Sequence, residues 1–284
     1  MKIPFKANLA SMLPFYAGLR KKCADLEERN RTLNDRIARL AAQRRLFEDL
    51  YAEYLDLRLR HDMPERGTKE WFEVMEFKYG GTIREVERKK VSDSDPRTQQ
   101  ELRTGGMVGG DRMSRLEHDY GQVFESCLRP FVRAHHRKVV LAEVGILKGT
   151  GLAIWAELFD DARVLGFDID LSHIHANMDD LRRRGAFKNN NVELYEFDQY
   201  KDNRALLEGL LRGDRFDVVI DDGVHYDQPV IATLESCMPF LADEFVYIIE
   251  DNATVAHRLM SLYGHYAIES IGEITVVKNR VLQA

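Results

Sequence analysis

The chain has 284 residues, of which 44% are hydrophobic and 31% charged, and only 7 are prolines. This composition indicates a soluble globular protein large enough to fold without disulfides, and no run of about 18 apolar residues is present to span a membrane. Met1 to Arg20 lacks a signal-peptide pattern. The cysteines, Cys23, Cys127 and Cys237, are far apart and form no CxxC, which argues against a disulfide framework or structural zinc and favours a reducing cytoplasm.

Charge is unevenly distributed along the chain. Residues 1–45 contain 11 Lys and Arg against 4 Asp and Glu, whereas residues 216–284 contain 3 against 11. The basic head suggests an anionic partner, and a weak contact with a membrane surface is one reading; we expect no nucleic-acid partner. The acidic end suggests that some of its carboxylates bind a cation.

The first segment, residues 1–62, has a heptad pattern and no Gly or Pro between Arg20 and Met63. We therefore predict a helical coiled coil that makes the protein a homodimer or higher oligomer. Asn30 at an a position favours a parallel two-stranded coil, and Lys22 would attract Glu27 of a partner. The alternative is one long helix folded back on its own domain. The d positions are Leu19, Leu26, Leu33, Leu40, Phe47 and Tyr54, and the a positions are Cys23, Asn30, Ile37, Arg44 and Tyr51.

Residues 63–115 read as a connector and active-site lid. Aromatic and β-branched residues are interrupted by Gly80-Gly81, and a polar, turn-rich stretch follows. The glycine-rich loop 105–113 then leads to a predicted helix through Tyr120 to Phe131.

Residues 116–284 alternate between short apolar strands and helices, which predicts a Rossmann-like, doubly wound α/β sheet. The chain ends in two strands without a helix between them, which predicts an antiparallel hairpin. The expected strands are 138–144, 163–170, 191–197, 215–221, 244–251, 267–273 and 274–282. The expected helices are 150–159, 171–185, 203–213, 228–241 and 253–264.

Ligands of such sheets bind at the carboxyl ends of the strands. After the first strand, residues 143–151 form a GxxxGxG loop, a spacing that disfavours a pyrophosphate site and by itself also fits a tight turn. Asp168 ends the second strand, where a carboxylate can bind ribose hydroxyls, and Asp198 ends the third, near an expected adenine edge.

Four carboxylates and an imidazole follow the fourth and fifth strands: Asp221, Asp222, His225, Glu250 and Asp251. So many like charges at neighbouring strand ends call for a cation. Oxygen ligands from Asp222 and Asp251 suit Mg²⁺, and His225 is in reach of a substrate proton. The alternative is that the two aspartates cap the next helix and His225 lies on the surface.

The segments EVGILKGTG, GFDID, DDGVH and IIEDN, in this order, resemble class I S-adenosylmethionine-dependent methyltransferases. More narrowly, they resemble the metal-dependent sugar O-methyltransferases of antibiotic biosynthesis, of the macrocin and mycinamicin type, and their cephalosporin hydroxylase-like relatives. GGDRM followed by Tyr120 resembles the segment that covers the cofactor in those enzymes. The resemblance spans residues 105–284 and implies a seven-stranded sheet. The chain departs from the family at Val224, where Ser is usual, and in its coiled coil.

The resemblance implies roles for individual residues. Glu143, Gly145 and Gly149 would hold the methionine part of S-adenosylmethionine. Asp168 would bind its ribose, and Asp198 would lie near its adenine. His225 would be the general base. Metal ligands would be Asp222 and Asp251, with Asp221 and Glu250 as further ligands or supporting groups.

These inferences predict an Mg²⁺-dependent O-methyltransferase acting on a sugar or glycoside hydroxyl. One alternative is a phenolic, catechol-type O-methyltransferase. A non-catalytic coiled-coil scaffold with a cofactor-binding domain is another. A nicotinamide-dependent oxidoreductase is disfavoured by the glycine spacing and the terminal hairpin.

Overall fold

The computed structural model describes residues 5–80, 112–115, 118–133, 138–159, 161–189 and 191–280, with side chains of the first helix from residue 21 onward. The chain divides into two compact units, Met1–Tyr54 and Leu55–Ala284.

The described residues of the first unit form one helix, α1 (Phe5–His61), which continues into the second unit after Tyr54. Strong helix formers such as Ala, Leu, Arg and Glu dominate its sequence, which explains its length. It begins well before Leu19, where the heptad pattern starts, and stops before Pro64 and Gly67, which has a φ of +79°. The predicted helix is confirmed, and its pairing into a coiled coil stays a prediction.

The second unit contains a seven-stranded sheet in the order β3-β2-β1-β4-β5-β7-β6. β1 to β5 are parallel, whereas β7 pairs antiparallel with both β5 and β6. The predicted doubly wound sheet with a terminal antiparallel hairpin is therefore confirmed. The strands are β1 (Val139–Val144), β2 (Ala162–Asp168), β3 (Val192–Glu196), β4 (Phe216–Asp221), β5 (Leu241–Ile249), β6 (Tyr266–Ile271) and β7 (Ile274–Asn279).

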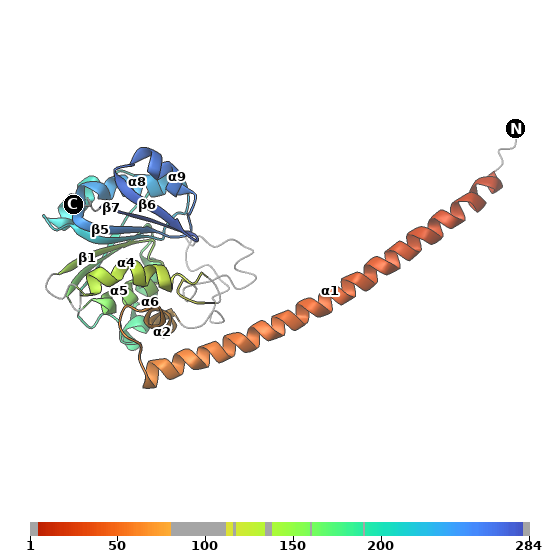
Figure 1. Ribbon diagram of the computed structural model, residues 1–284, viewed down its shortest axis with the longest axis horizontal. Helices are drawn as coiled ribbons and strands as arrows, with labels where there is room; N and C mark the ends of the chain where they lie inside the picture. Colours follow the sequence, from red (N-terminus) through yellow and green to blue (C-terminus); the bar gives the residue numbers. More distant parts are fainter. Residues whose placement is uncertain are drawn as a thin grey trace. The chain divides into compact units, whose positions relative to one another are not determined.

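Helices cover both faces of this sheet (Figure 1). Alternate residues of each strand point to opposite faces. One core cluster contains α2 (Lys69–Gly80), α4 (Gly121–Arg133), α5 (Thr150–Leu158) and α6 (Ser172–Arg183). The other contains α7 (Arg204–Leu211), α8 (Asp227–Cys237) and α9 (Val255–Leu262). Among the buried polar side chains, Glu143, Asp221 and Glu250 lie at or next to the carboxyl ends of β1, β4 and β5.

The connector begins as part of the sheet unit. Trp71, Phe72 and Met75 of α2 are at most 3% exposed and lie in one core cluster with α4 and α5. The unit boundary after Tyr54 thus differs from the predicted divisions after residues 62 and 115. Residues 81–111, which include most of the predicted lid and of the loop 105–113, lie outside the described residues.

One predicted helix is too long. Residues 228–241 were expected to be helical, but α8 ends at Cys237, a 3₁₀ turn spans Met238–Phe240, and Leu241 already begins β5. Pro239 explains the stop, because proline cannot donate the next backbone hydrogen bond of a helix.

Among the described helices, none is long and apolar enough to cross a membrane. Cys23, Cys127 and Cys237 are free thiols, and of these three only Cys23 is exposed.

Candidate active site

The carboxyl ends of β1, β4 and β5 lie side by side in the sheet, and the loops that follow them meet. Asp222 N donates a hydrogen bond to Val144 O at 2.8 Å. Gly145 has a φ of +86°, and a Cβ atom there would lie 2.1 Å from the carbonyl oxygen of Asp222. Glycine is required at this position because the two loops touch through their backbones.

Asp222, His225 and Asp251 come together where these loops meet. One ligand atom from each lies within 4.8 Å of the others, so the three could hold a metal ion. His225 Nε2 is 3.4 Å from Asp222 Oδ1, and His225 Nδ1 is 3.8 Å from Asp251 Oδ2. Asp251 adopts a φ of +52°, a left-handed conformation that aspartate tolerates better than most residues. The sequence predicted this grouping.

Each of the two carboxylates has one oxygen fixed by the protein. Arg112 donates to Asp222 Oδ2, and the hydroxyl of Tyr120 donates to Asp251 Oδ1. The other oxygens, Asp222 Oδ1 and Asp251 Oδ2, face the imidazole of His225. Two anchored carboxylates that each present one oxygen to a common gap fit a divalent cation with oxygen ligands.

Arg112 is the most buried cation of this region, with a side chain only 12% exposed. Besides Asp222, it pairs with Glu143 Oε1 at 2.8 Å and with Glu250 Oε2 at 2.9 Å. Burial alone would lower the pKa of Arg112, but the three carboxylates outweigh it and raise that pKa. One guanidinium therefore joins the ends of β1, β4 and β5.

Sequence reasoning did not single out Arg112 as a functional residue. The available signal was its place in GGDRM, the segment with a resemblance to a cofactor cover. Two of its three carboxylate partners, Glu143 and Asp222, are 31 and 110 positions away in the chain, and no local pattern predicts such pairs.

Two buried carboxylate oxygens near Arg112 lack a hydrogen-bond partner among the described residues: Glu143 Oε2 and Glu250 Oε1. Glu143 is 1% exposed and Glu250 2% exposed. Burial raises the pKa of both, and for Glu250 the nearby carboxylates of Asp222 and Glu143 raise it further. Such oxygens suit a ligand that brings hydrogen-bond donors or positive charge.

Neighbouring charges shift the pKa values of His225 and Asp222. Burial acts to lower the pKa of His225, but Asp222 and Asp251 outweigh it and raise that pKa. Burial acts to raise the pKa of Asp222, but Arg112 and His225 outweigh it and lower that pKa. In the absence of a bound cation, His225 is thus held toward its charged form.

Asp221 does not join the metal-binding group, which corrects its predicted role as a ligand. It is 1% exposed, and its two carboxylate oxygens accept hydrogen bonds from Gln199 Nε2 at 2.8 Å and from the hydroxyl of Tyr247 at 3.0 Å. Gln199 Oε1 in turn accepts a hydrogen bond from Val224 N at 2.6 Å. Asp221 and Gln199 therefore support the loop that carries Asp222 and His225.

The other predicted cofactor residues lie at the expected strand ends. Asp168 accepts hydrogen bonds from Leu147 N at 2.9 Å and Asp170 N at 3.2 Å, so it fixes the loop after β1. Gly149 has a φ of +80°, and a Cβ there would meet Ile174, which indicates a turn and packing role.

Asp198 follows β3 at the edge of this region. It pairs with Lys201 Nζ at 3.0 Å and accepts a hydrogen bond from Tyr200 N, also at 3.0 Å. These two contacts, the Lys201 one first, lower its pKa. Asp198 therefore remains charged and partly exposed at the end of β3.

A second group shares Asp251. His118, Asp251 and Glu273 also offer ligand atoms within 4.8 Å of one another, with His118 Nδ1 3.2 Å from Glu273 Oε2. Glu273 is 68% exposed, so this group is more open to solvent than the one formed with Asp222. Metal-binding experiments can therefore compare this second group with the group of Asp222, His225 and Asp251.

No protein-family profile and no curated protein sequence matches this chain. Similar solved structures include MycE, a methyltransferase of the mycinamycin biosynthetic pathway solved with Mg and SAH. It is 18% identical to this chain, the alignment covers 61% of this chain and 53% of MycE, and the TM-score is 0.47. The chain thus spans about half the length of MycE.

Two further similar structures have names in the same class. A putative O-methyltransferase from Klebsiella pneumoniae is 18% identical, with 54% of this chain and 78% of that one covered and a TM-score of 0.41. A putative caffeoyl-CoA O-methyltransferase from Staphylococcus aureus is 14% identical, with 53% and 79% covered and a TM-score of 0.41.

Proposed function

We propose that this protein is an S-adenosylmethionine-dependent O-methyltransferase that uses a divalent cation, Mg²⁺, to methylate a sugar or glycoside hydroxyl. The observation that carries the proposal is the grouping of Asp222, His225 and Asp251 beside the glycine loop of β1. This grouping supports a cation site and a base next to the strand end where a nucleoside cofactor binds in doubly wound sheets.

The cofactor fits the residues at the ends of β1, β2 and β3. Glu143 Oε2, a buried oxygen without a partner, would accept a hydrogen bond from the methionine ammonium group. Gly145 lets the loop after β1 lie against the backbone of Asp222, and Gly149 allows the turn that leads into α5. Asp168 would bind the ribose, and Asp198 would lie near the adenine. The bound cofactor supplies a methyl group already activated by its sulfonium.

The cation would be held by Asp222 Oδ1 and Asp251 Oδ2, and it would lower the pKa of an acceptor hydroxyl. Two adjacent sugar hydroxyls could complete its oxygen coordination, which is why we propose this acceptor class. Asp251 Oδ2 lies on the Nδ1 side of His225 and favours the tautomer with a proton on Nδ1. Nε2 of His225 then accepts the hydroxyl proton as the methyl ether forms.

Calorimetric titration tests cofactor and metal binding separately. S-adenosylmethionine should bind the purified protein, and Mg²⁺ should bind the wild type but not Asp222→Asn. Glu273→Gln, which alters only the second group around Asp251, should retain Mg²⁺ binding. If neither ligand bound the wild type, the proposal would be wrong; if Glu273→Gln alone lost Mg²⁺, the cation would belong to the second group.

Turnover tests the base and the acceptor. With S-adenosylmethionine and Mg²⁺, a panel of glycosides should show a mass increase of one methylene group, and a parallel panel of catechols should not. We expect His225→Ala to lower turnover by about 10²- to 10⁴-fold, the usual contribution of a general base. Methylation of catechols alone would favour the phenolic alternative, and turnover within a few-fold of wild type for His225→Ala would exclude the base role.

A further inference from the structure

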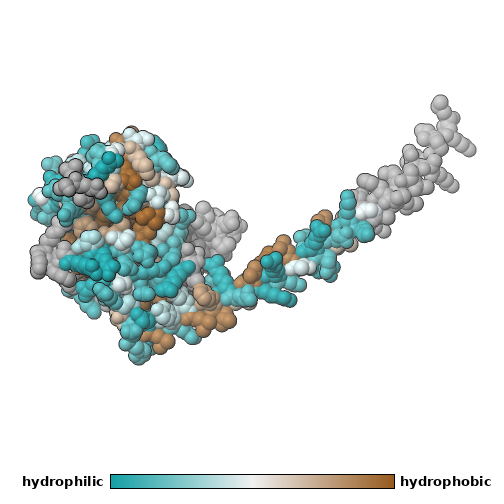
Figure 2. Space-filling view, in the orientation of Figure 1, coloured by the Kyte–Doolittle hydropathy of each residue, from teal (hydrophilic) through white to brown (hydrophobic). Residues whose placement is uncertain are grey.

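The first unit presents an uncovered row of apolar side chains along α1. Leu26, Leu33, Ile37, Leu40 and Phe47 are each 54–59% exposed. They recur at the alternating three- and four-residue spacing of a heptad, and brown apolar side chains are visible among teal hydrophilic ones along this helix (Figure 2). The described part of this unit is one helix, so nothing else in it covers the row.

We infer that this row binds the same row of a second copy of the chain, to form a parallel, in-register, two-stranded coiled coil over residues 19–54. Long isolated helices gain most of their stability from packing an apolar face against a partner. A self-complementary row that repeats every seven residues fits a copy of itself better than a membrane surface, which requires a broad apolar face.

Residues beside the row favour the parallel arrangement. In a parallel pair, each g residue faces the e residue of the next heptad, so Lys22 meets Glu27, Arg29 meets Asn34 and Arg36 meets Ala41. None of these three pairs joins like charges. In an antiparallel pair over the same residues, g residues face g residues, so the two copies of Arg36 would repel each other and Lys22 would no longer meet Glu27.

Two polar residues within the row are compatible with this pairing. Asn30 occupies an a position, where its amide can hydrogen bond to the same residue of the partner and so fix the register. Arg44 also occupies an a position, and its Nε lies 2.9 Å from Glu48 Oε1 on the same helix. Each copy therefore provides its own counter-charge for Arg44 at the interface.

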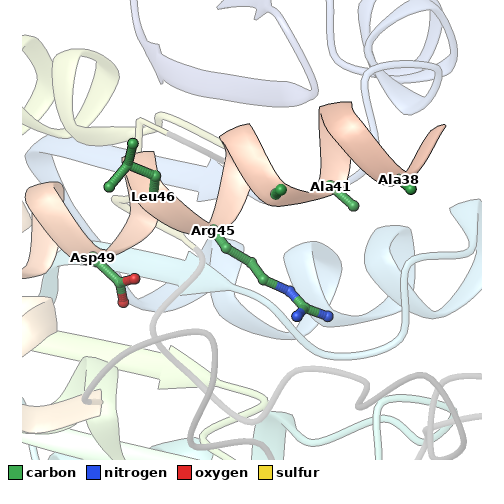
Figure 3. Close-up of a pocket in the computed structure, with 6 residues that line it drawn as sticks. Ala38, Ala41, Arg45, Leu46 and Asp49 are labelled. Atoms are coloured by element: carbon green, nitrogen blue, oxygen red, sulfur yellow. The ribbon is translucent and has the colours of Figure 1, made fainter. Parts of the chain in front are cut away.

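A shallow hollow on α1 lies beside the row of a and d residues. Its walls are Ala38, Ala41, Ala42, Arg45, Leu46 and Asp49, all from this one helix (Figure 3). None of them occupies an a or d position. Three alanines leave space between longer side chains on this face, and a hollow walled by a single helix encloses no ligand.

The orientation of the pair decides where the two sheet units begin. In a parallel coil, the two copies of Tyr54 face each other across helix axes about 10 Å apart. In an antiparallel coil over the same residues, they would lie roughly 50 Å apart, because a helix rises about 1.5 Å per residue. The parallel coil thus tethers two catalytic units at the same end.

Sedimentation of the full chain tests the pairing. A chain of 32.9 kDa should sediment as a species of twice that mass. Leu33→Asp with Leu40→Asp should give a monomer, whereas Ala24→Asp with Ala38→Asp, the same charges at outward b positions, should remain a dimer. A monomeric wild type would overturn the inference, whether or not it binds anionic vesicles of phosphatidylserine and phosphatidylcholine. A variant with both Leu33→Asp and Leu40→Asp that is still a dimer would also overturn it.

Two variants test orientation and register. Cys23 is exposed at an a position, so the two Cys23 thiols of a parallel pair face each other. The oxidant diamide should link them through a disulfide, because it takes up the two electrons and two protons that the thiols lose. Cys23→Ser should abolish the linked species, because Cys127 and Cys237 are buried. Asn30→Leu should yield species larger than a dimer. A dimer that diamide cannot link would contradict the parallel orientation, and an unchanged Asn30→Leu dimer would contradict the role of Asn30.

Discussion

Replacing Gly151 by alanine should destabilise the sheet unit, although alanine is the better helix former. Gly151 is the second residue of α5 and does not have a positive φ, so helix propensity favours alanine by up to about 1 kcal/mol. An added Cβ, however, would lie 2.0 Å from Glu143 Oε1 and 2.6 Å from Arg112 Nη1. The new methyl group therefore competes for space with the Glu143–Arg112 ion pair.

The magnitude follows from the burial of that pair. The side chains of Glu143 and Arg112 are 1% and 12% exposed, so neither can move into solvent. Breaking a buried pair costs about 3–5 kcal/mol. After subtraction of the propensity gain, we expect Gly151→Ala to lower the free energy of unfolding by about 2–4 kcal/mol.

Urea unfolding measures this difference, and Gly209→Ala is the matched control. Gly209 lies inside α7, and a Cβ there would meet no atom within 4 Å, so that variant should gain up to about 1 kcal/mol. Combining Gly151→Ala with Glu143→Ala tests the cause. If the Glu143 carboxylate is the obstacle, Gly151→Ala should lower the free energy of unfolding far less in the Glu143→Ala background than in the wild type. Strictly additive effects, or a Gly151→Ala variant as stable as wild type, would refute the reasoning.

The remaining predictions concern charged groups. Arg112→Gln should lower the free energy of unfolding by about 3–5 kcal/mol, because three carboxylates lose their buried counter-charge; a loss below about 1 kcal/mol in urea unfolding would contradict this. Burial raises the pKa of Asp221 from its ordinary value of 3.8 to about 7. Between these two pH values the carboxyl group keeps its proton in the folded state but has lost it in the unfolded state. The stability of wild type relative to Asp221→Asn should therefore fall as the pH rises from about 4 to about 7, by up to about 1.4 kcal/mol per pH unit, and a flat difference measured in EDTA would exclude the shift. Arg163, first through its hydrogen bond, lowers the pKa of Glu193 to about 2. The advantage of wild type over Glu193→Gln should be present above pH 4.5 and vanish as the pH falls toward about 2, which thermal melts across this range would reveal.

The apolar strands and the glycine turns were predictable because their signals are local. β1 reads as VVLAEV and is buried throughout, and the GxxxGxG loop follows it directly. Asp222, His225 and Asp251 were also predictable as a group, since each follows a parallel strand and parallel strand ends share one edge of the sheet. Strand and helix boundaries were predicted less well, as the early stop at Cys237 shows.

The separate roles of Asp221 and Asp222 were not predictable from their type. Asp221 is the last residue of β4 and Asp222 directly follows it, yet Asp221 binds Gln199 and Tyr247, whereas Asp222 faces His225 and Arg112. Successive residues of a strand point to opposite faces, so a one-residue difference decides which carboxylate supports the loop and which one reaches the candidate cation site.

The sequence by itself determined the helix of the first unit, the α/β order of the second and the strand ends where chemistry should occur, because hydrophobic periodicity and turn residues act over a few positions. Only the tertiary structure decided which side chains complete the site. Arg112 and Tyr120 reach Asp222 and Asp251 across 110 and 131 positions of the chain. Such contacts depend on how the whole sheet unit packs, and a side chain from a distant segment becomes a partner only when folding brings it to the same strand ends.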